Sequence, residues 1–276
     1  MFLATALIPP TPAWAQMWAL AVLIYATAKL VTWRLRSGAV PHWLVSVGYL
    51  LAWPGMHARR FFDRRQAIDR HPALREWVLA TVKLLFGLVL VFMISRWIPD
   101  ALPTLRAWVG MAGIVFVLHF GVFHLLSCAW RSLGYNAEPP MHWPVLATSL
   151  SDFWSRRWNT AFRDFTYQLL FRPLASRWGA TPALWIGFLA SGLVHDAVVS
   201  LPAGGGYGEP TLYFLIQPLG MLVERSQLGK RMGLGRGWRG WLFAALVLLL
   251  PAPLLFHQPF LGNIVNPFLD VLHGTV

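Results

Sequence analysis

The sequence predicts an all-α membrane protein, a polytopic bundle of about six to eight transmembrane helices with additional interfacial or re-entrant helices. The 276 residues are 57% hydrophobic and only 12% charged, whereas soluble domains carry about 45–50% apolar and about 25% charged residues. Several stretches also run without Asp, Glu, Lys or Arg for the roughly 20 residues that a helix needs to cross a bilayer. A soluble globular protein is therefore excluded.

The formal net charge of +12, from 23 basic and 11 acidic residues, does not indicate a nucleic-acid-binding protein. A nucleic-acid binder this basic would also be rich in polar surface. We therefore expect no nucleic-acid partner. The single cysteine, Cys128, excludes an intramolecular disulfide, and the sequence holds no Cys/His cluster that predicts a metal site. A lone thiol in an apolar helix is usually inert, because that medium disfavours the thiolate.

The predicted elements follow from the uncharged stretches in chain order. The first 28 residues carry no charge and so lack the basic region that opens a cleavable signal peptide, which predicts a retained membrane segment. Ser37 to Ala58 is uncharged but has prolines near both ends, which favours a short re-entrant or tilted segment. Full crossings are expected at 15–33, 77–97, 107–130, 180–200, 210–224 and 241–256. With no internal repeat or linker, residues 1–276 are expected to form one membrane domain.

The basic residues predict the orientation of this domain. Nineteen of the 23 lie in the intervals 34–75, 131–177 and 225–239. If the six stretches cross and 37–58 does not, all three intervals fall on one side, which the positive-inside rule assigns to the cytoplasm. We therefore expect a multi-pass integral membrane protein, in the cytoplasmic membrane if the source is bacterial.

Ser151 to Trp178 is too charged to cross the bilayer and too aromatic for a plain loop. On one continuous helix, an apolar stripe would contain Trp154, Trp158, Ala161, Phe162, Phe165 and Leu169. The opposite side would carry Asp152, Arg156, Asn159 and Arg163. This pattern predicts an interfacial helix whose cationic side is available to an anionic headgroup or phosphate, and a simple interfacial anchor explains it as well.

Phe188 to Ser200 places His195 and Asp196 deep in an apolar crossing, where ionisable residues are costly and indicate function. Ser191 and Gly192 precede His195 by four and three residues, so they share its face and leave room for a substrate or a neighbouring helix. Asp196 points about 100° away and is expected to pair with another group. A hydrogen bond between helices is the alternative interpretation of His195.

Four pieces together resemble the membrane-bound O-acyltransferase (MBOAT) superfamily in its wax-synthase-like branch: WPGM at 53–56, HFGVFHLLS at 119–127, FWSRRWN at 153–159 and FLASGLVHD at 188–196. The resemblance covers about residues 40–226, and FWxRRWN followed by SGxxH is its specific part. It implies a membrane-embedded helical fold that transfers an acyl group from a thioester, usually acyl-CoA, to a hydroxyl acceptor. Asp196 departs from the pattern, since wax synthases commonly have Glu there, and many family members are longer.

The resemblance maps the family's catalytic histidine onto His195 and its motif asparagine onto Asn159. His195 would be the general base, and Asn159 would orient it or hydrogen-bond the thioester carbonyl. Arg156, Arg157 and Arg163 are candidates for the CoA phosphates, although ordinary positive-inside residues would look the same. Trp154, Trp158, Ser191 and His124 complete the candidate substrate-binding residues. For His124, a packed core histidine is the competing interpretation, and its spacing from His119 prevents both from facing one cavity.

The predicted function is transfer of a fatty acyl group to a lipid hydroxyl, with a long-chain alcohol as the acceptor that the resemblance favours. Acyl-CoA is expected as co-substrate, with no other cofactor, and the expected partners are the lipid alcohol and membrane lipids. A sterol, diacylglycerol or glycan acceptor stays open. So does a proton-coupled transporter with a His195/Asp196 relay, although the sequence lacks the repeated halves that such transporters show.

Overall fold

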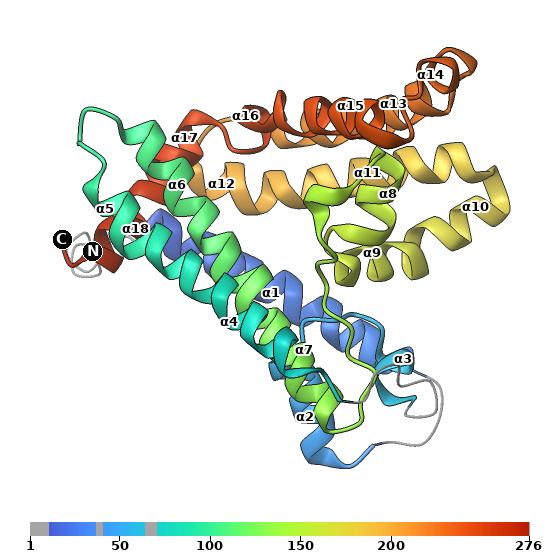
Figure 1. Cartoon of the computed structure of the whole chain (residues 1–276), viewed down its shortest axis with the longest axis horizontal. Coiled ribbons are helices and arrows are strands. Elements are labelled where there is room, and N and C mark those ends of the chain that lie inside the picture. The colour runs from blue at the N-terminus through green and yellow to red at the C-terminus, as the bar shows by residue number, and fades with distance from the viewer. Residues whose placement is uncertain (1–10, 37–40, 64–70, 276) are drawn as a thin grey trace, which may run out of the picture.

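The computed structural model describes residues 11–36, 41–63 and 71–275. Within these residues every regular element is a helix (Figure 1), which confirms the predicted all-α membrane class. Two groups of helices make up the fold. One contains α1 (Ala13–Arg34), α4 (Leu74–Val89), α6 (Pro103–Val115) and α7 (Phe123–Ser132), and the other contains α11 (Ala180–His195), α13 (Glu209–Arg225) and α15 (Gly237–Leu249).

Five helical stretches of the described chain are long and apolar enough to cross a membrane. They are Ala13–Arg34, Leu74–Trp97, Pro103–Ser132, Ala180–Ala203 and Gly237–Leu255. They agree with five of the six predicted crossings. Three of them contain a π-helical turn that joins α4 to α5 (Ser95–Trp97), α6 to α7, and α11 to α12 (Leu201–Ala203).

The sixth predicted crossing, 210–224, corresponds to α13, which is 17 residues long. This helix is shorter than the other five and buries two polar side chains, Gln217 and Glu224. It packs between α11 and α15 (Figure 1), so its polar face is turned toward protein. The helix is therefore confirmed, and its full crossing stays a prediction.

The segment predicted not to cross is described from residue 41 onward. It forms α2 (Trp43–Ala52), whose ten residues extend about 15 Å, half of the roughly 30 Å hydrocarbon core. Residues 53–57 then run without helix to the short α3 (Ala58–Phe62). This length agrees with a re-entrant or tilted segment.

The prediction of one continuous helix over Ser151 to Trp178 is wrong. The chain breaks at Trp158 and Asn159, where Asn159 adopts the left-handed φ of 40°. Asparagine tolerates this conformation better than most residues do, and its side-chain oxygen accepts a hydrogen bond from the Phe162 N–H at 3.2 Å. The apolar stripe predicted from Trp154 to Leu169 therefore does not continue across the break. The observed elements are α8 (Leu150–Asp152), a π turn (Phe153–Arg157), α9 (Thr160–Thr166), a second π turn (Tyr167–Phe171) and α10 (Arg172–Trp178).

The remaining helices cover the ends of the two groups. They are the 3-10 turn Pro144–Leu146, α14 (Gln227–Met232), α16 (Ala252–Leu255), α17 (Gln258–Phe260), a π turn (Leu261–Val265) and α18 (Asn266–His273). The C-terminal α18 returns to the first group, where Arg106 and Asp270 form an ion pair at 2.5 Å. Leu269 and Ile264 are buried in the apolar core that the C-terminal helices share with α6.

Candidate active site

Two of the motif stretches meet on one aromatic side chain of α13. The ring of Phe214 lies 4.4 Å from the His195 ring and 5.8 Å from the Trp154 ring, centroid to centroid. Phe188, two turns before His195 on α11, packs edge-on against Trp154 at 5.5 Å. The structure therefore brings the FWSRRWN segment and the end of α11 to the same place.

The hydrogen bond of His195 fixes which ring nitrogen carries the proton in the neutral form. Its Nδ1 lies 2.7 Å from the backbone carbonyl oxygen of Ser191. Because a carbonyl oxygen only accepts, Nδ1 must carry the hydrogen, and Nε2 keeps a free lone pair. Among the described residues, the only hydrogen bond of the His195 side chain is the one from Nδ1. The hydroxyl of Ser191, predicted to face substrate, donates to the Gly187 carbonyl at 2.9 Å.

Asp196 is bound to the turn before α13 and to the start of that helix. One carboxylate oxygen accepts from Ser200 Oγ at 3.0 Å and from the Gly208 N–H at 2.8 Å. The other accepts from the N–H of Thr211 at 3.1 Å and from its hydroxyl. The expectation that Asp196 pairs with a group other than the His195 site is confirmed. A carboxylate held by donors on both oxygens at a helix N-terminus caps that helix.

Helix α13 holds the FWSRRWN segment through two buried side chains that sequence reasoning missed. Gln217 accepts a hydrogen bond from Trp154 Nε1 at 3.3 Å. Glu224 accepts from the backbone N–H groups of Leu150 and Ser151, at 2.8 and 3.1 Å. Gln217 and Glu224 are seven residues apart and therefore share a helix face. Two polar residues at this spacing in an apolar stretch were the signal that could have found them.

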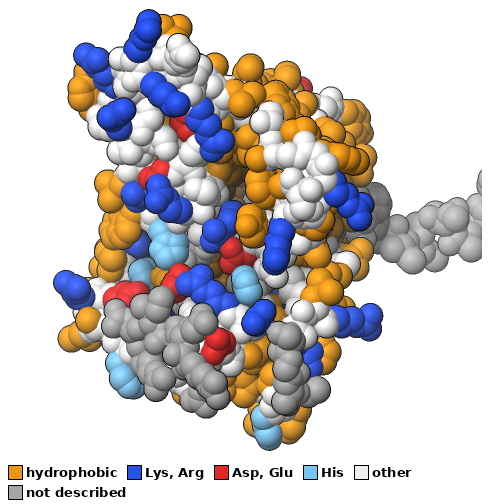
Figure 2. Space-filling view, turned by 90° about the vertical axis from the view of Figure 1, so that its right-hand side faces the viewer, with side chains coloured by type: hydrophobic (Ala, Val, Ile, Leu, Met, Phe, Trp, Pro, Cys, Tyr) orange, Lys and Arg blue, Asp and Glu red, His pale blue; other side chains and the backbone are white. Residues whose placement is uncertain are grey.

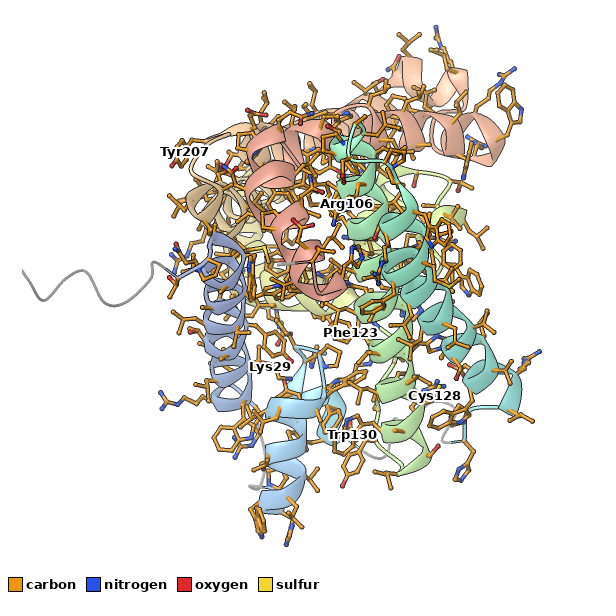
Figure 3. All side chains as sticks on the ribbon, turned by 90° about the vertical axis from the view of Figure 1, so that its left-hand side faces the viewer. Lys29, Arg106, Phe123, Cys128, Trp130 and Tyr207 are labelled. Atoms are coloured by element: carbon orange, nitrogen blue, oxygen red, sulfur yellow. The ribbon has the colours of Figure 1, made fainter. Side chains whose placement is uncertain are left out.

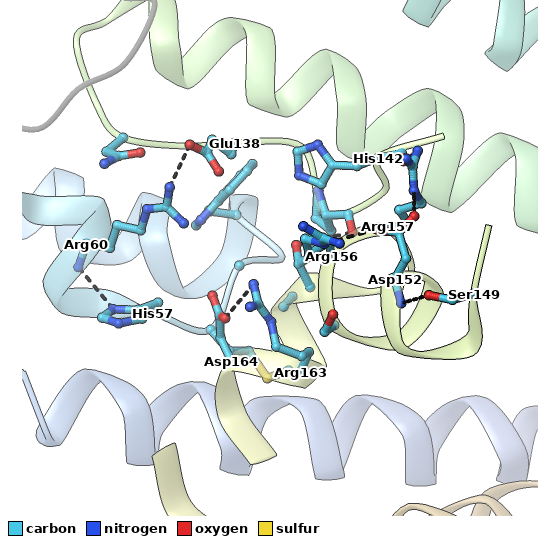
Figure 4. A pocket seen from close by; sticks show the side chains of 18 of the residues that line it. His57, Arg60, Glu138, His142, Ser149, Asp152, Arg156, Arg157, Arg163 and Asp164 are labelled. Atoms are coloured by element: carbon cyan, nitrogen blue, oxygen red, sulfur yellow. Dashed lines mark hydrogen bonds and ion pairs between the residues drawn. The ribbon is translucent and has the colours of Figure 1, made fainter. Parts of the chain in front are cut away.

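A polar cavity of about 670 Å³ opens beside this segment (Figure 4). Its walls come from three stretches of the chain, 53–60, 136–142 and 148–164, with Gly235 at one edge. On the molecular surface, basic, acidic and histidine side chains gather in a hollow flanked by hydrophobic residues (Figure 2). The ionisable lining residues are His57, Arg60, Glu138, His142, Asp152, Arg156, Arg157, Arg163 and Asp164.

The three predicted phosphate-binding arginines all line this cavity, but they differ in what holds them. Arg157 binds Asp152 at 2.5 Å and also approaches two backbone carbonyls, of His142 and Trp143. Arg163 pairs with Asp164 at 2.9 Å. Arg156 contacts Asp152 at 3.0 Å while its side chain is 76% exposed. Arg156 is therefore the arginine most free to turn toward a bound anion.

The cavity perturbs three of its ionisable groups through burial. Burial raises the pKa of Asp164, against the opposing effect of Arg163 and His57. Burial lowers the pKa of His57 and of His142 below the usual histidine value, with the nearby carboxylates opposing. Both histidines are thus favoured in the neutral form, so the arginines provide the positive charge of the cavity.

Asn159, Trp158 and His124 lie elsewhere. Among the described residues no contact joins Asn159 to His195, and the Asn159 side-chain oxygen caps α9. Trp158 stacks on His119 at 6.4 Å and on Phe153 at 5.6 Å, which joins the HFGVFH and FWSRRWN pieces. These three predicted residues are not among the residues that line the polar cavity.

His124 packs between α4 and α7 rather than along the cavity. Its Nε2 lies 3.1 Å from Glu76, whose carboxylate also binds Arg131. With Cys128, these side chains offer the ligand types of a metal site, with ligand atoms within 4.8 Å of one another. Arg131 also lies 3.6 Å from the Cys128 sulfur, so the guanidinium supplies the positive charge there. The group forms an ion-pair network between the two helices.

Comparison with known proteins identifies the part of the chain that contains these features. Residues 137–216, which include Trp154, His195 and Phe214, match the model of the membrane bound O-acyl transferase family. This region is similar to the members of that family. This match, together with the relatives described next, confirms the predicted resemblance to its wax-synthase-like branch.

The relatives are named for one activity. A long-chain-alcohol O-fatty-acyltransferase of Simmondsia chinensis is 33% identical over 115 residues, 37% of this chain and 33% of that protein. Probable long-chain-alcohol O-fatty-acyltransferase 7 of Arabidopsis thaliana is 30% identical over 149 residues, 48% of this chain and 42% of the relative. Probable long-chain-alcohol O-fatty-acyltransferase 2 of Arabidopsis thaliana is 29% identical over 210 residues, which are 70% of this chain and 59% of the relative. The chain thus spans between a third and three fifths of the length of these relatives.

Proposed function

We propose that this protein transfers a fatty acyl group from acyl-CoA to the hydroxyl of a long-chain alcohol, with His195 as the general base. The observation that carries the proposal is the free Nε2 of His195, located where Phe214 also contacts Trp154 of the FWSRRWN segment. The family match over 137–216 and the names of the relatives support this reaction class.

In the proposed reaction His195 Nε2 accepts the proton of the alcohol O–H as the alcohol oxygen attacks the thioester carbonyl carbon. The new C–O bond gives a tetrahedral intermediate with negative charge on the former carbonyl oxygen. When the C–S bond breaks, the proton on Nε2 passes to the departing CoA thiolate. The products are the ester and free CoA, and His195 returns to its neutral form with the proton on Nδ1.

The donor would be held by the polar cavity. Arg156, Arg157 and Arg163 lie on its wall, and guanidinium groups pair with phosphates through two parallel hydrogen bonds. Within the described residues Asn159 neither lines this cavity nor contacts His195, and its side-chain oxygen caps α9; in this proposal it shapes the segment that carries the arginines. This arrangement has the basic intervals facing the cytoplasm, where acyl-CoA is present.

The proposed attack is direct and forms no acyl-enzyme. Cys128 is fully buried beside Arg131 in the network with Glu76, where a thioester has no access. The transporter alternative receives less support, because both oxygens of Asp196 are occupied by donors from the turn and from Thr211. A proton relay needs a carboxylate that can release these partners.

The test is acyl transfer by the purified wild type in lipid nanodiscs with labelled acyl-CoA. A panel of acceptors would contain a long-chain alcohol, a sterol, a diacylglycerol and a glycan. The proposal expects labelled ester with the alcohol and release of one CoA for each ester formed. Labelled ester with only one of the other acceptors would reject the long-chain alcohol as the acceptor. Substrate-dependent proton flux without any acyl transfer would reject the enzyme.

A further inference from the structure

Lys29 is a buried lysine in the membrane-spanning helix α1 that the proposed reaction does not use. It is 1% exposed, and an ionisable side chain inside a crossing is costly enough to indicate a function. Its Nζ donates to the Gly55 carbonyl at 2.7 Å and lies 3.3 Å from the centre of the Tyr49 ring. In the part of the chain that the structure describes, no carboxylate lies within ion-pair distance of it.

A second donor on α1 binds the same segment. Tyr25, four residues before Lys29, donates from its hydroxyl to the Trp53 carbonyl at 2.9 Å. One turn of helix rises about 5–6 Å, and alternate residues of an extended chain are about 7 Å apart. Trp53 has extended backbone angles, φ −135° and ψ 117°. Two donors one turn apart on α1 thus meet two alternate carbonyls of the non-helical segment 53–57.

That segment is a wall of the polar cavity. Trp53, Gly55, Met56 and His57 all line the cavity. Met56 also packs with Ala28, the neighbour of Lys29 on α1. Lys29 itself points from α1 toward the part of the chain that contains α2 and α3 (Figure 3). Helix α1 therefore holds this wall through Tyr25, Ala28 and Lys29.

We propose that Lys29 is a positioning residue for the acyl donor, which fixes the 53–57 wall against which the CoA part of the donor binds. This inference rests on the proposed function and extends it to α1, a helix that contributes no residue to the lining of the polar cavity. Without the Lys29 Nζ donor, the Gly55 carbonyl loses its partner in an apolar setting, and a buried polar group without a partner is costly. The wall would then move to find another donor, and the cavity would lose its shape.

The first test measures how accessible the 53–57 wall is to a labelling reagent, and it needs no enzymatic activity. A cysteine at position 56 (Met56→Cys), in a Cys128→Ala background, would be labelled with a water-soluble maleimide. Lys29→Met is expected to speed labelling about tenfold, which corresponds to about 1.4 kcal/mol. Lys29→Arg, which can still donate to the carbonyl, should restore most of the original rate. Thr27→Met, on the exposed face of the same helix, is the matched control and should change nothing.

The second test measures the KM for the acyl donor. In the acyl-transfer assay, Lys29→Met should raise the KM for acyl-CoA about tenfold while the kcat and the KM for the alcohol change less than about twofold. If Lys29→Met does not fold, Tyr25→Phe removes the neighbouring hydrogen bond alone and should act in the same direction more weakly. Unchanged labelling together with an unchanged KM overturns the inference. A wild type without acyl transfer would defeat the proposed function, and the labelling rates would still decide the role of Lys29.

Discussion

His195 and the arginine-lined cavity lie in regions of opposite character. His195 is surrounded by aromatic and small residues, and its one described polar contact is with a backbone carbonyl of its own helix. The cavity holds four arginines, and each is paired with a carboxylate. Under the proposed function the two regions have different roles: the apolar region would hold the neutral general base, and the polar region would bind the charged part of the donor. Substitutions in one region should therefore change the rate constant, and substitutions in the other should change affinity.

The largest effect is expected from His195→Gln, which removes the proposed base and keeps the approximate size of the side chain. General-base catalysis contributes about 10²- to 10⁴-fold, so kcat should fall by that factor. Steady-state kinetics with acyl-CoA and a long-chain alcohol would measure it. His42→Gln, at an exposed histidine, is the control and should retain full activity. Full activity of His195→Gln would remove His195 from the mechanism.

A smaller loss is expected from Phe214→Leu, since Phe214 is the side chain that both His195 and Trp154 contact. Displacement of a catalytic group by about 1 Å can cost up to about 100-fold, so we expect kcat to fall about 10- to 100-fold. The KM for acyl-CoA should stay the same. Phe86→Leu removes a ring that pairs with Phe116 on the other group of helices, and it should leave kcat unchanged. Equal losses in both variants would contradict a specific role for Phe214.

The fold and the candidate site were predictable from the sequence only in part. Five crossings were predictable because the length of an uncharged apolar stretch is what decides whether a helix can span the bilayer. The break at Asn159 was not predictable, because one left-handed residue interrupts a pattern whose periodicity fits a helix on both sides. His195 stood out as an ionisable residue in an apolar stretch, whereas Phe214 looked like any other apolar side chain of its helix.

The cavity was the part least accessible to sequence reasoning. Arg156, Arg157 and Arg163 were candidates because guanidinium groups pair with phosphates through two hydrogen bonds. Arg60 and Glu138, which pair at 2.6 Å, are 78 residues apart and meet only in the fold. The link from Lys29 to Gly55 likewise joins a membrane helix to a distant segment. Such pairs depend on how the helices pack, which local patterns do not encode.

Substitutions of the cavity arginines should have different effects, because the arginines differ in their partners. Arg156→Gln is expected to raise the KM for acyl-CoA about three- to tenfold and to leave stability unchanged, since the side chain is largely exposed. Arg157→Gln removes a half-buried partner of the buried Asp152 and should lower the Tm by about 4 °C. Kinetics and thermal unfolding in detergent would compare the two. Loss of stability in Arg156→Gln would mean that it too is structural.

The smallest effect concerns pH. Burial lowers the pKa of His57 and His142, so the folded protein keeps them neutral while the unfolded chain takes up protons below about pH 6.5. Their contribution to stability is therefore present above pH 6.5 and is lost as the pH falls below it. In His57→Gln/His142→Gln, the fall in Tm between about pH 7 and pH 5 should be smaller by about 2 °C. An identical pH dependence in the wild type and the double variant would contradict this account.

The most direct test of the division between the two regions measures binding and transfer on the same samples. The equilibrium Kd of a nonhydrolysable acyl-CoA thioether and the rate of ester formation at saturating acyl-CoA would be determined for the wild type, His195→Gln and Arg156→Gln. We predict that His195→Gln keeps the Kd and loses the rate, and that Arg156→Gln keeps the rate and binds more weakly. A His195→Gln protein that loses binding as well, or an Arg156→Gln protein that loses only the rate, would contradict the assignment of chemistry to one region and donor binding to the other.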